Sequence, residues 1–240
     1  MRGRTAAAAL ALAAGILGLA AVREHCADPA ARTRPAIAGD VAPRPVRLAP
    51  GESLRLAVFG TSLTANDRWP EGAADTIAAD LGRPVSLLRV ARAGADSGWA
   101  VRQTDRLLAF GPHLVVVEFA INDADIVDGV SLRKSVSNHR ALLDALGRET
   151  GVILMTTNPA RGLRGWVRPC LGAYYGAYRS LAAETGAGLL DLAPRWEELL
   201  RETPGALPDG LHPAQGLGEQ VIAPTLAELV RQAVTLQDGG

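Results

Sequence analysis

The chain has 240 residues, a length typical of one domain with a short appendage. Hydrophobic residues make up 48% of it and charged residues 21%, a balance that predicts a globular core and excludes wholesale disorder. The 25 Lys and Arg residues equal the 25 Asp and Glu residues, which argues against a general nucleic-acid binder, because such proteins carry a basic surplus. Two cysteines are too few for a zinc cluster or a disulfide framework. Lys134 is the only lysine, a bias typical of a GC-rich bacterial genome.

The first residues show a pattern typical of export. Arg2 and Arg4 precede an uncharged run over residues 5–22, composed almost entirely of Ala, Leu, Gly and Ile. A basic start followed by an apolar stretch predicts a secretory signal peptide over residues 1–22, and the run is also long enough for an uncleaved membrane anchor. A buried, alanine-rich core helix is the remaining alternative. We therefore expect an exported protein, periplasmic or extracellular, with residues 5–22 as a membrane tether where the segment is not cleaved.

Residues 23–52 are rich in Pro, Ala and Arg and show no period, so they are predicted to form a tether to a domain over residues 53–240. In an exported protein Cys26 and Cys170 could pair and pin this tether to the domain. Two separate free thiols account for the sequence equally well, so the sequence leaves the pairing open.

From residue 54 onward, short apolar runs alternate with helical patterns. Such runs without polar alternation are typical of strands buried on both faces. The predicted strands are 54–59, 85–90, 114–119, 152–157 and 188–192. The predicted helices are 70–81, 99–110, a helix that Ser131 caps, 173–185 and 214–233. The alternation predicts the α/β fold class: a flavodoxin-like, parallel five-stranded sheet in a three-layer α/β/α sandwich.

In a parallel sheet the ligand site lies beyond the carboxyl ends of the strands, so functional side chains are expected directly after each strand. Ser62 follows the first strand, Gly94 the second and Asn122 the third. Asp209 and His212 precede the last helix. Acyl transfer needs this set of groups: a nucleophile, a base, a residue that orients the base, and donors for an oxyanion.

Four short motifs at these positions match, in order, the four blocks of the SGNH (GDSL-type) hydrolases. They are Gly60-Thr61-Ser62-Leu63, Gly94, Asn122-Asp123 and Asp209-x-x-His212. The chain therefore resembles this family over roughly three quarters of its length, although only about ten positions carry the resemblance. Thr61 stands where the family has Asp, and Ala120 stands where it has Gly. Neither position supplies catalytic chemistry, but Thr61 is expected to alter the hydrogen bonds that shape the nucleophile turn.

The resemblance implies a role for each of these residues. Ser62 is the nucleophile, His212 takes its proton and later gives it to the leaving alcohol, and Asp209 holds the imidazole. The oxyanion is held by the backbone N–H groups of Ser62 and Gly94 and by the Asn122 side chain. The reaction needs neither a metal nor a cofactor.

Each motif alone also has a purely structural interpretation. Ser62 suits a helix cap, Gly94 a turn, and His212 an exposed loop. Asp123 and Asp125 compete with Asp209 as the residue that orients the base, and the three-residue spacing favours Asp209. The other histidines are weaker candidates for the base: His113 is expected at the opposite edge of the sheet, His139 inside a helix, and His25 in the tether.

The segment over residues 158–169 carries three arginines and a tryptophan and is expected to overhang the site. Arg161, Arg164 and Trp166, together with Asp123, are the candidate substrate-binding residues, because Arg pairs with carboxylates and Trp stacks on sugar faces. A solvated loop with Trp166 packed against the domain is the alternative.

Together these features predict an exported serine esterase, a lipase-like acylhydrolase acting through an acyl-serine intermediate. Short loops leave little room for a deep acyl tunnel, which favours small acyl groups such as acetyl on a carbohydrate. The expected partner is a small-molecule or glycan ester, and no nucleic acid. An O-acyltransferase with the same triad, a lysophospholipase or thioesterase, and a catalytically silent glycan-binding domain remain as alternatives.

Overall fold

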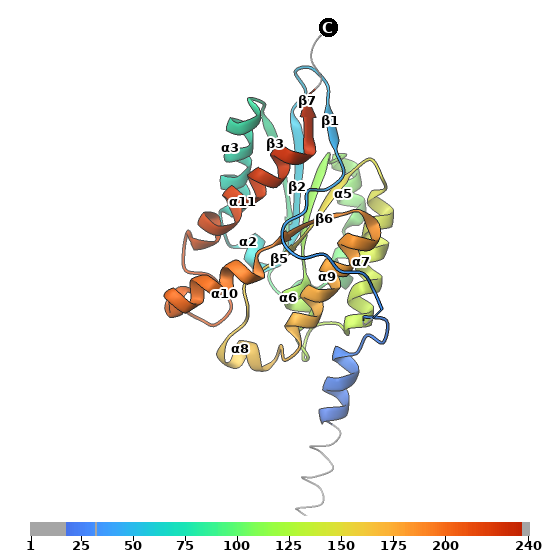
Figure 1. Cartoon of the computed structure of the whole chain (residues 1–240), viewed down its shortest axis with the longest axis vertical. Helices are drawn as coiled ribbons and strands as arrows, with labels where there is room; N and C mark the ends of the chain where they lie inside the picture. The colour runs from blue at the N-terminus through green and yellow to red at the C-terminus, as the bar shows by residue number, and fades with distance from the viewer. Residues whose placement is uncertain (1–17, 32, 237–240) are drawn as a thin grey trace, which may run out of the picture.

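The computed structural model describes residues 18–31 and 33–236, whose central element is a five-stranded sheet between two layers of helices (Figure 1). All strands pair in parallel, in the order β3-β2-β4-β5-β6. Their bounds are β2 Leu54–Gly60, β3 Val85–Ala91, β4 Leu114–Glu118, β5 Gly151–Thr156 and β6 Gly188–Asp191. The predicted sandwich and its five-stranded parallel sheet are confirmed, with every strand end within about one residue of the predicted position.

The strand order fixes where a site can form. After β2 the chain adds β3 on one side of it and then β4 on the other, so the direction of winding reverses between β2 and β4. Gly60 at the end of β2 pairs with Glu118 at the end of β4. The crevice beyond these two carboxyl ends is the topological switch point at which open α/β sheets bind their ligands.

Two apolar cores lie on opposite faces of the sheet. One face packs against α4 (Ser97–Val101), α5 (Thr104–Phe110), α7 (Leu132–Leu146) and α9 (Leu171–Thr185). The other packs against α3 (Trp69–Leu81), α10 (Ala193–Glu202) and α11 (Leu217–Ala233), as Figure 1 shows. β4 and β5 are buried along their whole length, which explains their continuous apolar sequences, whereas the edge strand β3 is only partly buried.

The helices follow the predicted pattern with two differences. The helix predicted over residues 99–110 is divided into α4 and α5, and α10 was not predicted. Ser131 caps α7 as expected, because its side chain accepts a hydrogen bond from the Lys134 N–H. Three short helices and one 3-10 turn lie in the connections: α2 Ser62–Ala65, α6 Ala120–Asp123, α8 Gly162–Trp166 and η1 Pro204–Ala206.

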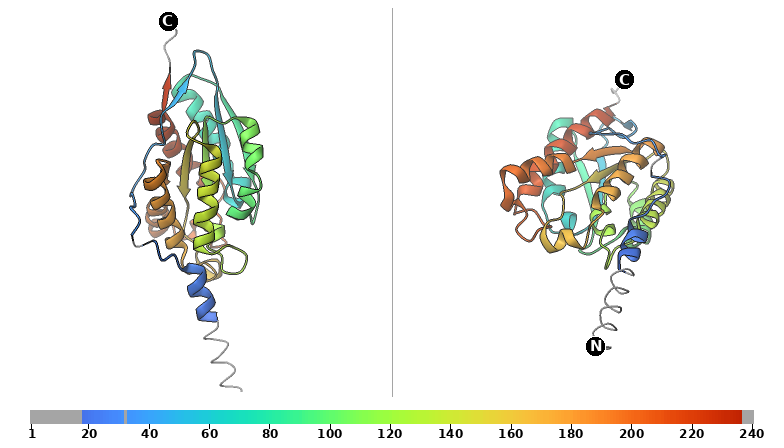
Figure 2. Two further views of the ribbon diagram at one scale, coloured as in Figure 1. Left: turned by 90° about the vertical axis from the view of Figure 1, so that its right-hand side faces the viewer. Right: turned by 60° about the horizontal axis from the view of Figure 1, so that its bottom comes forward.

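The segment predicted as a tether is instead fixed along the domain. We call residues 33–48 the strap; Figure 2 shows it running along one side of the molecule. β1 (Val46–Leu48) pairs in parallel with β7 (Val234–Leu236), and Val41 forms an antiparallel bridge with Leu189 of β6. Backbone hydrogen bonds and buried apolar side chains hold the strap against the sheet. The composition of the segment alone did not reveal these contacts.

Before the strap, residues 18–26 form a helix that projects from the end of the molecule at which the strands terminate (Figures 1 and 2). A disulfide joins Cys26 at the end of this helix to Cys170, so the two thiols are paired. Residues 1–17, which hold most of the predicted signal segment, lie outside the described residues. None of the helices in the described part of the chain is long and apolar enough to cross a bilayer.

Candidate active site

The hydroxyl and the imidazole expected to react lie in direct contact. Ser62 is the first residue of α2, immediately beyond β2, and its Oγ lies 2.8 Å from Nε2 of His212. Nδ1 of His212 lies 2.7 Å from one carboxylate oxygen of Asp209. A nucleophile, a base and an orienting carboxylate therefore form one continuous hydrogen-bonded chain.

Both oxygens of Asp209 are occupied by the turn that carries His212. Its other oxygen accepts the backbone N–H groups of Leu211 at 2.9 Å and His212 at 2.7 Å. Partial burial acts to raise the pKa of Asp209, but the backbone and side-chain hydrogen bonds from His212 outweigh it and hold the pKa well below its usual value. The carboxylate therefore stays ionised and fixes the imidazole with Nδ1 protonated, which leaves Nε2 free to accept the Ser62 proton.

The expected oxyanion donors lie beside Ser62. A cavity of about 280 Å³ is lined by Ser62, Gly94, Asn122 and His212 together. Gly94 has φ +73°, in the left-handed region that favours glycine, and turns the backbone into this cavity's wall. The Asn122 amide donates to the Ala95 carbonyl at 2.9 Å. That bond fixes the orientation of the amide, which has a second hydrogen to donate.

A buried carboxylate that the sequence reading missed supports the nucleophile turn. Glu118, at the end of β4, accepts hydrogen bonds from the Thr61 N–H at 2.9 Å and from the hydroxyls of Thr61 and Thr64, each at 2.8 Å. A Cβ at Gly60 would lie 2.6 Å from a Glu118 oxygen, so this close approach requires glycine. The signal was available in the sequence: a charged residue within the apolar run Val115–Phe119.

Burial raises the pKa of Glu118 to about 7, more strongly than its hydrogen bonds lower it. The carboxyl group reaches position 61, where the family pattern carries an acid, from the neighbouring strand β4. Thr61 at the same time caps α2 by accepting the Leu63 N–H. The departure at Thr61 is therefore accompanied by a local network that holds the turn.

The four candidate substrate-binding residues separate into two groups. Arg164 lines the cavity, and its guanidinium lies 4.0 Å from Asp209. Arg161 is turned away from it and pairs with Glu197 of α10 at 2.5 Å. Trp166 is largely exposed and is not among the residues that line the cavity, so it is neither packed against the domain nor inside the site.

The expectation for Asp123 is wrong. This side chain is fully buried and points away from the cavity, because its oxygens accept the Ser97 N–H at 2.7 Å and the Ser135 hydroxyl at 2.6 Å. Burial raises the pKa of Asp123 to about 6. It holds the Asn122 loop to α4 and α7 and does not contact substrate.

Four further polar residues line the cavity that were not proposed as substrate contacts: Asn66, Asp125, Asp128 and Arg168. Arg168 is nearly buried, donates to the Ile121 carbonyl at 2.8 Å and pairs with Asp125 at 3.0 Å. Only the fold brings these loop residues together, so no sequence spacing pointed to them. They make the cavity wall polar and charged.

The remaining histidines do not reach this site. His113 lies at the amino end of β4, the opposite edge of the sheet, where it accepts the Arg55 N–H at 3.1 Å. His139 is buried inside α7, between the Ser135 carbonyl and the Tyr178 hydroxyl, each at 2.8 Å. Burial lowers the pKa of His139 to about 4, so it is neutral at neutral pH.

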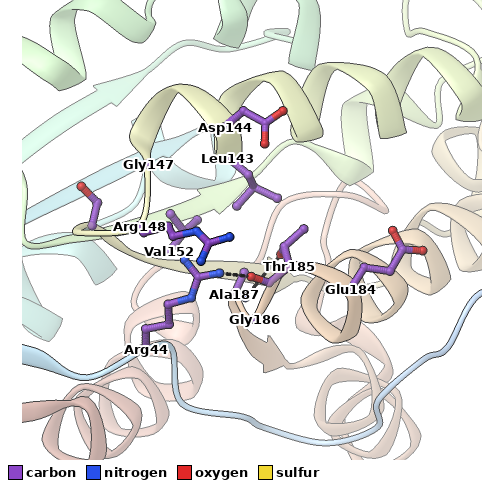
Figure 3. Close-up of a pocket in the computed structure, with 11 residues that line it drawn as sticks. Arg44, Leu143, Asp144, Gly147, Arg148, Val152, Glu184, Thr185, Gly186 and Ala187 are labelled. Carbon is purple, nitrogen blue, oxygen red and sulfur yellow. Dashed lines mark hydrogen bonds between the residues drawn. The ribbon is translucent and has the colours of Figure 1, made fainter.

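A larger cavity, of about 570 Å³, lies before β5 and β6 at the other end of the sheet (Figure 3). Charged side chains such as Arg44, Arg148 and Glu184 line it. Among the described residues around it there is no serine, cysteine or histidine, whereas the smaller cavity holds the hydrogen-bonded pair of Ser62 and His212.

Comparison with known proteins agrees with this geometry. The model of the GDSL-like Lipase/Acylhydrolase family matches residues 58–215, a span that includes both Ser62 and His212. No curated protein matches the sequence. The structure is similar to the lipase/acylhydrolase from Enterococcus faecalis, with 18% identity and a TM-score of 0.63 over 78% of this chain and 100% of that one.

Two esterase structures are similar as well. The acetyl xylan esterase Axe2 from Geobacillus stearothermophilus shares 18% identity, with a TM-score of 0.65 over 78% of this chain and 99% of that one. The psychrotrophic esterase EstA from Pseudoalteromonas sp. shares 19% identity, with a TM-score of 0.58 over 74% and 97%. At these identities the structures establish the fold, and the family match over most of the chain establishes the relationship: the chain belongs to the GDSL-like lipase/acylhydrolase family and is an ester-hydrolysing enzyme.

Proposed function

We propose that the enzyme hydrolyses short acyl esters, such as acetyl groups on a carbohydrate, through an acyl-serine intermediate on Ser62. The observation that carries the proposal is the hydrogen-bonded chain from Ser62 through His212 to Asp209, with contacts of 2.8 and 2.7 Å. These contacts lie within the range that proton transfer between a nucleophile and its base requires.

The reaction follows from this geometry in two halves. His212 accepts the Ser62 proton as Oγ attacks the ester carbonyl, and the negative oxygen of the tetrahedral intermediate accepts hydrogen bonds from the Ser62 N–H, the Gly94 N–H and the Asn122 amide. His212 then gives the proton to the departing alcohol, which leaves the acyl-serine. A water molecule that loses a proton to His212 attacks the acyl-serine, and the proton returns to Ser62 as the acid is released.

The size and charge of the cavity support a short acyl group on a polar alcohol. A volume of about 280 Å³ is small, and Asp125, Asp128, Arg164 and Arg168 give its wall carboxylates and guanidinium groups. Hydroxyl-rich alcohols such as sugars offer hydrogen-bonding partners to these groups, whereas a long acyl chain would leave them desolvated and unpaired. The similarity to a protein named an acetyl xylan esterase agrees with this choice.

We also propose that the enzyme is exported. The basic start and the uncharged run over residues 5–22 have the pattern of a secretory signal or anchor. The disulfide between Cys26 and Cys170 supports the same conclusion, because such bonds persist in oxidising compartments outside the cytosol.

Labelling with a fluorophosphonate probe tests the nucleophile. The wild-type chain should be labelled on the peptide that contains Ser62, and Ser62→Ala should lose both labelling and ester hydrolysis, the latter by about 10⁴-fold or more. Ser137→Ala, an exposed serine on α7, is the matched control and should be labelled like wild type. Labelling retained by Ser62→Ala would refute the mechanism. Acyl transfer to an added glycan in preference to acetate release would instead assign an acyltransferase.

Arg164 provides a test of the alcohol side of the substrate. Arg164→Ala should raise KM for an acetylated acidic glycan by about tenfold, because it removes the guanidinium from the cavity wall, while KM for a neutral acetylated sugar changes little. Arg161→Ala is the matched control, since Arg161 pairs with Glu197 outside the cavity. Equal effects of the two substitutions on the acidic substrate would argue against a role for Arg164 in recognition.

A further inference from the structure

We propose that the end of the molecule around the catalytic cavity docks on the surface of a lipid bilayer through four exposed apolar side chains. These are Leu19, Val127, Leu163 and Trp166, which we call the apolar rim. Their exposed fractions lie between 71% and 85%, whereas the other exposed large apolar side chains of the described residues reach at most 46%. Single exposed apolar residues are ordinary, but the most exposed ones all occur at one end.

Three members of the rim are close sequence neighbours of residues that line the catalytic cavity. Leu163 and Trp166 lie on α8 on either side of Arg164, and Val127 lies between Asp125 and Asp128. These three rim residues therefore lie near the cavity, at the end where the strands of the sheet terminate. Figure 1 and the right-hand view of Figure 2 show α8 and the helix over residues 18–26 projecting at this same end.

Covalent and hydrogen bonds fix the rim segments to one another. The Ile126 N–H donates to the Val167 carbonyl at 2.9 Å, which joins the Val127 loop to the end of α8. The Tyr174 hydroxyl lies 2.7 Å from the Val130 carbonyl and 3.3 Å from the His25 carbonyl, so it contacts both the loop and the amino-terminal helix. The disulfide from Cys26 to Cys170 adds a covalent bond between that helix and the start of α9. The rim is thus a preformed surface.

A bilayer is the partner that the neighbouring chain indicates. The uncharged run over residues 5–22 ends within the helix over residues 18–26, so Leu19 belongs to both, and the length of the run suits the hydrocarbon core of a membrane. Basic side chains lie alongside: Arg164 between the rim residues, and Arg133 and Lys134, which share a cavity wall with Ala21 of the amino-terminal helix. Carboxylates lie there as well, Asp125 and Asp128 beside Val127 and Glu24 beside Arg133 and Lys134, so the charge at this end is mixed. The partner is therefore indicated by Trp166 and the leucines, which favour the membrane interface, and not by a net charge.

Docking would turn the cavity mouth toward the lipid headgroups. If the proposed esterase function holds, the substrates within reach of Ser62 are esters carried at the membrane surface. The docking itself rests on the rim, the disulfide and the apolar run, and it is tested without turnover.

Tryptophan quenching in reconstituted vesicles tests the orientation. The full-length chain is incorporated into vesicles of phosphatidylethanolamine and phosphatidylglycerol in which part of the acyl chains are brominated. The emission of Trp166 should be quenched and its maximum shifted to shorter wavelength, and Trp166→Phe should lose this component. Leu163→Asp should reduce the docked population about tenfold and the quenching with it, because it replaces an apolar contact by a charge. Leu108→Asp, on α5 near the opposite end, is the matched control and should be quenched like wild type.

Two outcomes would overturn the proposal: equal quenching of wild type and Trp166→Phe, or a full-length chain that does not associate with the vesicles. A second copy of the chain covering the rim, detected as a dimer that Leu163→Asp dissociates while quenching is absent, would overturn it as well. Leu163→Asp should hydrolyse a soluble ester in detergent at the wild-type rate, since Leu163 lies outside the cavity. If the wild-type chain hydrolysed no ester, the esterase proposal would fail, and the quenching result would still test the docking proposal.

Discussion

At the scale of single residues, Asp209 has the most sharply defined role. One oxygen faces His212 Nδ1 and the other accepts two backbone N–H groups of the same turn. In Asp209→Asn the amide oxygen can keep the backbone bonds, but the amide N–H₂ then faces Nδ1 and favours the imidazole tautomer with Nε2 protonated. That tautomer cannot accept the Ser62 proton, so kcat should fall by about 10⁴-fold.

The measurement is kcat on a soluble acetyl ester together with the urea midpoint. The midpoint should change little, because the Asp209 side chain is 44% exposed and the turn keeps its backbone bonds. A variant that retains kcat within a few-fold would show that another group orients His212, and Asp125, which lines the same cavity, would be the next residue to test.

Glu118 should make stability depend on pH in an unusual direction. Burial raises its pKa to about 7 from the ordinary value of 4.5, so between these values the folded chain holds a proton that the unfolded chain has lost. Because the folded state binds more protons, the free energy of unfolding should fall as pH rises through this window, by on the order of 3 kcal/mol from this group.

Glu118→Gln removes the titration while keeping an oxygen that accepts the Thr61 N–H. The difference in unfolding free energy between wild type and this variant, measured in urea at several pH values, should therefore change between about pH 4.5 and about pH 7. A constant difference would mean that the carboxyl group does not titrate in this range.

At the scale of elements, strands were more predictable than helices and loops. The run over residues 114–117 is apolar throughout because both faces of the sheet are covered, and such short runs are typical of buried strands. The short helix α8 contains Gly162 and Gly165, which are poor helix formers, so it left no helical signal. β1 and β7 are three residues each, too short to show a period.

The site likewise contains some features that could be predicted from the sequence and others that could not. The reacting groups could be predicted because each follows or precedes a recognisable element in a motif. The pairing of Cys26 with Cys170 could not, since the two thiols are 144 residues apart and only folding brings them together.

Loss of the disulfide should loosen one element and leave the rest intact. In Cys26→Ser with Cys170→Ser, hydrogen exchange should accelerate over residues 18–31, because the helix retains few other contacts with the domain, among them the Tyr174 bond to His25. Exchange in β4 and β5 and the rate of soluble-ester hydrolysis should stay near wild type. Fast exchange throughout the sheet would show that the bond stabilises the whole domain.

At the scale of the whole molecule, the strap is part of the fold. Leu48 is fully buried in the same core as Leu114 and Leu226. Leu48→Ala should lower the free energy of unfolding by about 2–5 kcal/mol in a single cooperative transition, whereas Leu108→Ala, at a half-exposed position on α5, should lower it by less than about 1 kcal/mol. An unchanged free energy of unfolding in Leu48→Ala would instead favour the prediction that residues 23–52 are a tether.

The sequence separation of 150 between Ser62 and His212 also bears on how the enzyme matures. Ser62 follows β2, near the start of the domain. His212 follows all five strands of the central sheet in the sequence and lies in the connection between η1 and α11. A nascent or truncated chain that ends before His212 therefore holds an inert serine, and the first turnover marks the completion of folding. During refolding from urea, hydrolysis should accordingly recover no faster than the slowest change in tryptophan emission.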